Sequence, residues 1–133
     1  MIIDASVVYK VLVEEEGTEV AKSVIADHEG VAPHLILSEV GNALWKAVRR
    51  RELRPHFAGA GLSSIPELLT IVDESFVMPR AAEIAVELDH PIYDCVYLAL
   101  AEHRAVRLIT ADRRFLKALA GSVFEPLTME LSA

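Results

Sequence analysis

Four acidic residues of this chain stand where a carboxylate is costly to place. Asp4 follows the apolar stretch MII, and Asp112 follows RLIT after a single alanine. Asp94 lies within the almost wholly apolar segment PIYDCVYLALA, and Glu39 lies beside the apolar stripe of an amphipathic segment. An aspartate is seldom carried into a buried element unless a partner or a chemical role holds it there. If these acids meet, their all-oxygen donor set would favour Mg²⁺ or Mn²⁺ over zinc.

The elements that must position these acids are short strands alternating with helices. The predicted strands are apolar on both faces, which is typical of a parallel sheet covered by helices. Strands are predicted at MIID (1–4), GVAP (30–33), LLTIV (68–72), AVRLIT (105–110) and SVFEPL (122–127). Helical periods are present at residues 5–13, 19–28, 35–53, 55–61, 76–88, 92–103 and 111–119. We therefore predict one domain over residues 1–133, an α/β fold built as a three-layer α/β/α sandwich with a central, mostly parallel sheet.

The predicted fold offers a place where the acids can converge. In an open α/β sheet, ligands bind beyond the carboxyl ends of the strands, where the strand order reverses. Asp4 and Asp112 each connect a strand to a helix, so their carboxylates meet if the two strands are neighbours. Asp94 falls in the first turn of the 92–103 helix. At about 4 Å and an effective dielectric of about 20, each pair of carboxylates repels by roughly 4 kcal/mol, which a divalent cation would remove.

Helix capping is the competing interpretation of the three aspartates. Aspartate is favoured at a helix start, where it caps the backbone and complements the helix dipole. Taken singly, each aspartate would be assigned as a cap, and Glu39 as a solvent-facing residue. The four acids together, without an obvious basic partner, favour the metal site. Ser6 and Thr110 lie beside two of the acids, where their hydroxyls can either cap a helix start or orient a carboxylate or a metal-bound water. Asn42 shares the Glu39 side of its helix.

The charge balance limits how the protein can bind nucleic acid. The chain carries a formal net charge of −7, which argues against nucleic-acid binding through bulk charge. One local exception is the stretch WKAVRRRELR, with Lys46, Arg49, Arg50 and Arg51. Taken alone, this stretch is interpreted as a solvated helix face.

Other features indicate an intracellular protein without a membrane anchor. No apolar run approaches the roughly 18 residues of a membrane span, and the N-terminal stretch is a poor signal peptide. The single cysteine, Cys95, cannot form an internal disulfide, which fits a reducing cytoplasm. The histidines lack a paired metal-binding spacing and are interpreted as surface or packing residues.

Four segments carry a family resemblance across essentially the whole chain. They are MIIDASVVYKVLV, SEVGNALWKAV, IYDCVYLALA and LITADRRFL, in that order. In these segments the sequence resembles the PIN-domain family, and more narrowly the VapC-type toxin ribonucleases of toxin–antitoxin pairs. The resemblance implies an endoribonuclease whose Mg²⁺ or Mn²⁺ is held by Asp4, Glu39, Asp94 and Asp112. It also implies supporting roles for the hydroxyls of Ser6 and Thr110 and for Asn42, a frequent polar position after the glutamate. Some members carry a further acid just after the last aspartate, whereas Arg113, Arg114 and Phe115 follow here, which leaves the number of metal ions open.

The resemblance also implies partners. It implies an RNA substrate, a homodimer, and a cognate antitoxin whose tail covers the active-site groove. Lys46 and the arginines at 49–51 would then meet the RNA backbone.

Other protein classes fit less well. A receiver domain has two adjacent acids after its first strand, and a dehalogenase-type phosphatase has two aspartates separated by one residue. The DAS that follows the first strand here matches neither pattern. A catalytically silent PIN-like interaction module remains the main alternative.

Overall fold

The core of the molecule is a parallel sheet with the strand order β3-β2-β1-β4-β5. The computed structural model describes residues 1–132. The strands are β1 (Ile2–Ile3), β2 (Val31–Pro33), β3 (Thr70–Val72), β4 (Leu108–Thr110) and β5 (Thr128–Glu130). Every neighbouring pair is parallel, which confirms the predicted α/β class.

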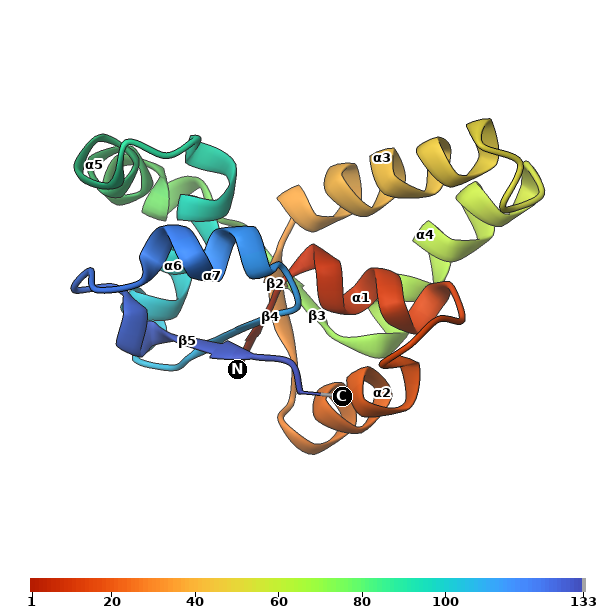
Figure 1. The fold of residues 1–133 in the computed structure, drawn as a ribbon, viewed down its shortest axis with the longest axis horizontal. Helices are drawn as coiled ribbons and strands as arrows, with labels where there is room; N and C mark the ends of the chain where they lie inside the picture. Colours follow the sequence, from red (N-terminus) through yellow and green to blue (C-terminus); the bar gives the residue numbers. More distant parts are fainter. Residues whose placement is uncertain (133) are drawn as a thin grey trace.

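Helices cover both faces of this sheet. They are α1 (Ala5–Leu12), α2 (Thr18–Asp27), α3 (Leu35–Arg49), α4 (His56–Leu68), α5 (Met78–Leu88), α6 (Ile92–Arg104) and α7 (Arg113–Leu119), with 3₁₀ turns at Ser75–Val77 and Glu125–Leu127. In Figure 1, α1 to α4 lie on one side of the strands and α5 to α7 on the other. Right-handed crossovers produce this division, because the chain first winds from β1 through β2 to β3 and then winds the other way, from β3 to β4 and on to β5. The predicted three-layer arrangement is therefore confirmed.

The winding reverses between β1 and β4, as the predicted convergence of acids requires. The two strands pair with Ile2 opposite Leu108 and Ile3 opposite Ile109. The backbone N–H of Asp4 extends the ladder by donating to the Ile109 carbonyl at 3.0 Å. The chain segments that leave β1 and β4 therefore begin side by side.

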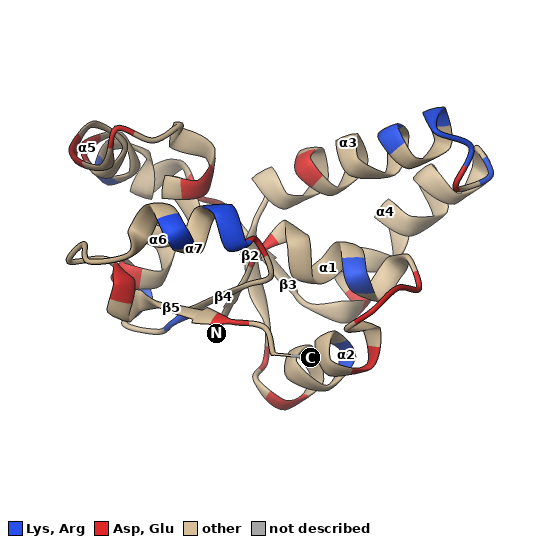
Figure 2. Ribbon diagram, in the orientation of Figure 1, with Lys and Arg blue, Asp and Glu red and all other residues tan. Residues whose placement is uncertain are grey.

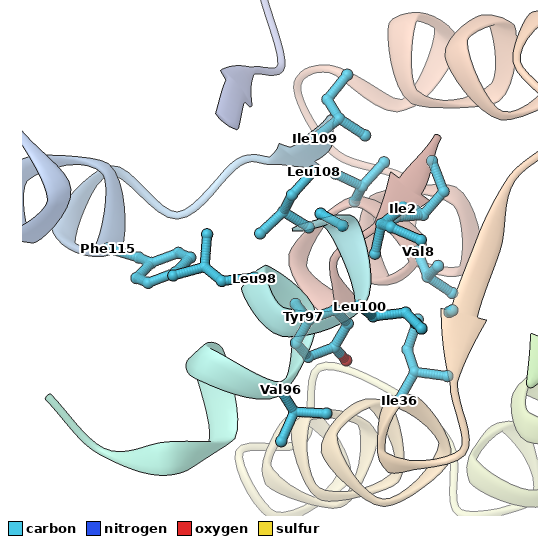
Figure 3. Packing of buried hydrophobic residues seen from close by; sticks show 14 of the residues in the cluster. Ile2, Val8, Ile36, Val96, Tyr97, Leu98, Leu100, Leu108, Ile109 and Phe115 are labelled. Atoms are coloured by element: carbon cyan, nitrogen blue, oxygen red, sulfur yellow. The ribbon is translucent and has the colours of Figure 1, made fainter. Parts of the chain in front are cut away.

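Helix α6 is the central, most deeply buried helix of its side of the sheet. Its residues from Cys95 to Ala101 are all buried, and the helix packs against β1, β2 and β4. Figure 3 shows Tyr97, Leu98 and Leu100 of this helix among residues of the strands and of α3. Burial of each large apolar side chain contributes about 1.5–3 kcal/mol, so α6 is firmly held. Within residues 1–132, no helix has the length and hydropathy needed to cross a bilayer.

Several predicted boundaries were wrong. The predicted strand SVFEPL forms a turn and a 3₁₀ segment instead, and the last strand begins only at Thr128. A proline at position 126 is unfavourable inside a strand, and the Glu125 carboxylate accepts a hydrogen bond from the Gly121 N–H at 2.7 Å, which favours the turn. The short helix predicted at 55–61 continues to Leu68. Helix α3 ends at Arg49 rather than at residue 53, and Arg51 has the left-handed φ of 62°.

Candidate active site

All four predicted acids line one cavity. The cavity has a volume of about 450 Å³ and lies where the carboxyl ends of β1 and β4 meet α3 and α6. The residues predicted to support the acids, Ser6 and Asn42, line it as well, together with the basic residue Lys46. The full lining is Asp4, Ala5, Ser6, Tyr9, Glu39, Val40, Asn42, Ala43, Lys46, Asp94 and Asp112.

Asp4 is the most firmly fixed of the acids. Its Oδ2 accepts hydrogen bonds from the Ser6 hydroxyl at 2.5 Å, the Ser6 N–H at 3.3 Å and the Thr110 hydroxyl at 2.8 Å. Ser6 Oγ also accepts from the Ala111 N–H at 2.9 Å, and Thr110 Oγ1 accepts from the Asp112 N–H at 3.0 Å. Ser6 and Thr110 thus tie the loop after β1 to the loop after β4 and orient Asp4 between them.

Capping, the competing interpretation, applies to two of the three aspartates. Asp4 is the N-cap of α1, and Asp112 is the N-cap of α7, where its Oδ1 accepts from the N–H groups of Arg114 and Phe115 at 3.0 and 3.1 Å. Asp94 lies in the first turn of α6 but is not its cap, because Pro91 holds that position. The Asp94 carboxylate instead contacts a histidine, with Oδ2 2.7 Å from Nε2 of His90.

Glu39 is held from the opposite helix. Its Oε1 accepts a 2.7 Å hydrogen bond from the hydroxyl of Tyr97, which is fully buried in α6. Glu39 lies on α3 and Tyr97 on α6, so this bond joins two walls of the cavity. Figure 3 shows the Tyr97 ring among the core side chains, with its oxygen at the end of the ring.

The four carboxylates share one pattern of hydrogen bonding. Each has one oxygen bound by the protein, namely Oδ2 of Asp4, Oε1 of Glu39, Oδ2 of Asp94 and Oδ1 of Asp112. Within residues 1–132, the second oxygen of each carboxylate receives no hydrogen bond or ion pair from the protein. None of these second oxygens is a fully buried orphan in the described part of the chain. Four oriented carboxylates with free, accessible oxygens are the donor set that a hard cation needs.

The acids also influence one another's protonation. Burial raises the pKa of Asp4, hydrogen bonds from Ser6 and Thr110 oppose that rise, and the charge of Asp94 adds to it. The pKa of Glu39 is raised to about 7, chiefly by burial; the hydrogen bond from Tyr97 opposes this rise, and the charges of Asp4 and Asp94 add to it. The cavity therefore concentrates negative charge that a bound cation would relieve.

The spacing of the acids narrows the kind of cation site. Within residues 1–132, no three of the four carboxylates bring ligand oxygens within 4.8 Å of one another. Mg²⁺ commonly keeps several waters and is held by one or two carboxylates together with substrate phosphates. Carboxylates that are this far apart, each with one free oxygen, suit a hydrated ion that keeps several of its waters. They do not suit an ion enclosed entirely by protein ligands.

A second cluster of possible ligands has its ligand atoms within 4.8 Å of one another, but its side chains already bond to the backbone of a loop. It comprises His34, Asp73 and Glu74, which follow β2 and β3. Asp73 accepts from the N–H and hydroxyl of Ser75, and Glu74 accepts from the backbone N–H of His34 at 2.9 Å. These contacts fix an exposed loop, so we assign this cluster no role in the site.

The basic residues predicted to meet a polyanion extend away from the cavity along α3. Lys46 lines the cavity, and Arg49 lies one turn further on, with its guanidinium 5.5 Å from the Trp45 ring. Figure 2 shows the acidic segment of α3 nearer its start and the basic segments towards its far end. Arg50 is paired with Glu52 at 3.0 Å on the surface. Only Lys46 of the predicted set reaches the cavity itself.

Sequence analysis missed the residues that orient Asp94 and Glu39. His90 was interpreted as a surface or packing residue, although it stands four positions before Asp94, a spacing at which the two side chains can meet. The aromatic ring of Tyr97 fitted the apolar helix 92–103, and its hydroxyl gave no sequence signal. Its partner Glu39 lies 58 positions away, so only the folded structure, which brings the two side chains together, reveals the pair.

Comparisons with known proteins show which family the chain is similar to. A family model described as PIN domain matches residues 1–120. Ribonuclease VapC1 of Mycobacterium tuberculosis is 32% identical over 117 residues, which cover 85% of this chain and 86% of that protein.

Solved structures resemble the whole fold. PAE2754 from Pyrobaculum aerophilum matches with a TM-score of 0.69 and 25% identity, covering 98% of this chain and 87% of that one. A toxin–antitoxin complex from Klebsiella pneumoniae matches with a TM-score of 0.64, covering 96% of this chain and 94% of that chain. Its identity is only 16%, so this second likeness concerns the fold alone.

Proposed function

This chain belongs to the PIN-domain family, and we propose that it is a metal-dependent endoribonuclease, the toxin of a toxin–antitoxin pair. The substrate is RNA, and the reaction is hydrolysis of a phosphodiester bond at the cavity lined by Asp4, Glu39, Asp94 and Asp112. The observation that carries the proposal is the shared hydrogen-bonding pattern of these carboxylates. Each is oriented through one oxygen and leaves the other free at the same cavity.

Mg²⁺ or Mn²⁺ would be held by these acids, with the remaining positions left to water and the RNA phosphate. When bound, the ion supplies positive charge that activates an attacking water and offsets the charge on the phosphate. The protein's own contribution is orientation. Ser6 and Thr110 fix Asp4, Tyr97 fixes Glu39, and the start of α7 fixes Asp112, so that little rearrangement is needed when ion and substrate arrive.

We propose that α3 guides the RNA strand to this cavity. Lys46 and Asn42 line the cavity, so they can contact the phosphate and sugar next to the cleaved bond. Arg49 lies about 4.5 Å further along the helix axis, at three residues and about 1.5 Å per residue. Arg50 and Arg51 stand at the end of α3 and extend the basic surface beyond it. This local basic track allows an acidic protein to hold a polyanion.

The proposed partners are a cognate antitoxin and a second copy of the chain. The resemblance to VapC-type toxins implies the first, and a chain with the same fold occurs in the K. pneumoniae toxin–antitoxin complex. An antitoxin arginine that enters the acidic cavity would replace the charge of the cation and so inhibit the enzyme. Exposed aromatic side chains, among them Trp45, Phe57 and Phe76, supply apolar surface for association of two copies.

The deciding experiment incubates the purified chain with a linear and a circular RNA, with Mg²⁺, with Mn²⁺ and with EDTA. The proposal expects metal-dependent cleavage of both RNAs, because an endonuclease needs no free end, and products with 5′-phosphate and 3′-hydroxyl ends. Cleavage of the linear RNA alone would indicate an exonuclease. If neither RNA is cleaved with metal present, the silent interaction module becomes the better description.

A further inference from the structure

Among residues 1–132, His90 makes the one hydrogen-bond contact with the Asp94 carboxylate. We propose that His90 is a positioning residue that holds Asp94 in the orientation needed to bind a divalent cation. This inference rests on the proposed function of the acidic cavity. It adds a residue that neither the family resemblance nor the comparisons assign.

The geometry of the contact is specific. His90 Nε2 lies 2.7 Å from Oδ2 of Asp94, and both side chains are partly buried, with exposed fractions of 20% and 27%. An ionised carboxylate can only accept a hydrogen bond, so Nε2 must carry the proton and donate it. Among residues 1–132, no other side chain or backbone group donates to Asp94.

The imidazole is itself held in place. The backbone N–H of His90 donates to the Ala85 carbonyl at 3.0 Å, and Asp89 turns the chain there with a left-handed φ of 51°. The imidazole ring lies 5.3 Å from the ring of the buried Phe115. His90 is therefore fixed by its backbone and by its ring before it donates to Asp94.

Asp94 depends on a side-chain donor for its orientation more than Asp4 and Asp112 do. Asp4 accepts from Ser6 and Thr110, and Asp112 accepts from two backbone N–H groups at the start of α7. Both are thus oriented by the loops in which they stand. Asp94 lies inside the first turn of α6 without a capping bond, and a free aspartate side chain there could rotate away from the cavity. The donor at His90 removes that freedom and leaves Oδ1 for the cation.

Two substitutions separate the hydrogen bond from the packing. His90→Phe keeps a ring against Phe115 but removes the donor, whereas His90→Gln keeps an amide donor near the place of Nε2. Mn²⁺ affinity is measured without RNA by titration calorimetry and by the paramagnetic resonance of free Mn²⁺. We expect His90→Phe to weaken Mn²⁺ binding about 10- to 100-fold, and His90→Gln to remain within about threefold of the parent. Should His90→Phe fail to fold, His90→Leu carries the same test.

Two further variants test whether the loss of Mn²⁺ affinity comes from Asp94 and not from a general disturbance of the fold. Asp94→Asn removes the proposed ligand, so adding His90→Phe to it should cost little further Mn²⁺ affinity, because both changes act on one ligand. His103 offers a matched control, since it packs edge to face against Phe76, with ring centroids 4.7 Å apart, in the last turn of α6 and away from the cavity. His103→Phe should bind Mn²⁺ as the parent does.

The outcomes distinguish this inference from the proposed function. A folded His90→Phe protein with parental Mn²⁺ affinity overturns the role of His90 and leaves the metal site standing. Equal losses in His90→Phe and His90→Gln also overturn it, because the donor would then not matter. A parent chain that binds no Mn²⁺ overturns both the metal site and the role of His90.

Discussion

Tyr97 and Glu39 are joined by a 2.7 Å hydrogen bond across the candidate active site, from the phenolic hydroxyl to Oε1. Tyr97 is fully buried in α6, and burial raises its pKa well above the ordinary value, so the hydroxyl stays protonated and can only donate to the carboxylate. The bond therefore fixes the position of Glu39 and favours its ionised form.

Removing that hydroxyl should change both stability and the pH dependence of cleavage. In Tyr97→Phe the ring still fills the core, but Glu39 loses its donor at a half-buried site, which should cost about 1 kcal/mol of unfolding free energy. The hydrogen bond lowers the pKa of Glu39, so its loss should raise that pKa above about 7. Cleavage that needs ionised Glu39 should then rise at a higher pH than in the parent. Identical pH–rate profiles would show that Tyr97 serves packing only.

Glu39 should make the metal-free fold more stable as the pH falls. Its pKa is raised from 4.5 to about 7 in the folded state, so between these values the folded chain binds more protons than the unfolded chain. Its contribution to stability is therefore lost as the pH rises through about 7. Once solvent screening is allowed for, the effect is on the order of 1–2 kcal/mol.

Glu39→Gln isolates this contribution from the other titrating groups. Without metal, the variant should be more stable than the parent at pH 8, and the difference should shrink towards pH 4.5. Urea denaturation across this pH range measures it. A constant difference would mean that Glu39 titrates normally in the folded protein.

A divalent cation should stabilise the fold through the cavity acids. Mn²⁺ at a hundredfold excess over its dissociation constant should add about 2.7 kcal/mol, which for a chain of this length is several degrees of melting temperature. Asp94→Asn should abolish most of this gain. Without metal it should be at least as stable as the parent, because the charge of Asp94 raises the pKa values of Asp4 and Glu39 and so opposes their ionised forms.

A surface acid provides the control for this melt. Asp73 belongs to the exposed cluster with His34 and Glu74, which has a metal-like spacing. Asp73→Asn should keep the full Mn²⁺ stabilisation, although it loses the carboxylate that accepts from Ser75. If the cation effect disappears in Asp73→Asn and persists in Asp94→Asn, the metal binds at the loop cluster and not in the cavity.

The placement of the acids was predictable because it follows from local patterns and one topological rule. Asp4 and Asp112 stand after apolar strands, and parallel strands deliver such residues to one edge of a sheet. That β1 and β4 are neighbours was a condition of the prediction, and the observed pairing meets it. Glu39 and Asp94 could be placed from the stripe of one helix and the first turn of another.

The partners of the acids were harder to predict, because they depend on packing between distant segments. The hydrogen bond from Tyr97 requires that the fold place its position on α6 opposite Glu39 on α3. The contact from His90 needs the turn at Asp89 and the support of Phe115, which belongs to α7. The misplaced last strand has a different, local origin, since hydrogen bonds of the 121–125 turn outweighed the β-branched and aromatic residues there.

The basic track along α3 can be tested through the salt dependence of RNA binding. Each phosphate contact on single-stranded RNA contributes about 0.7 to the slope of log affinity against log salt. Lys46→Ala removes a cation from the cavity and should flatten the slope by about one contact. The triple change of Arg49, Arg50 and Arg51 to alanine should flatten it further, although Arg50 is already paired with Glu52.

Arg80 supplies the matched control for this titration. It is bonded to Glu102 at 2.7 Å and lies on α5, on the opposite side of the sheet from α3. Arg80→Ala should leave the salt slope unchanged, and Mn²⁺ stabilisation should survive in the arginine variants. Lys46 lines the acidic cavity, so its removal should strengthen Mn²⁺ binding while it weakens RNA binding, because one positive charge near the carboxylates is lost. If the α3 variants and Arg80→Ala all keep the parental salt slope, α3 is a solvated helix face and the RNA follows another path.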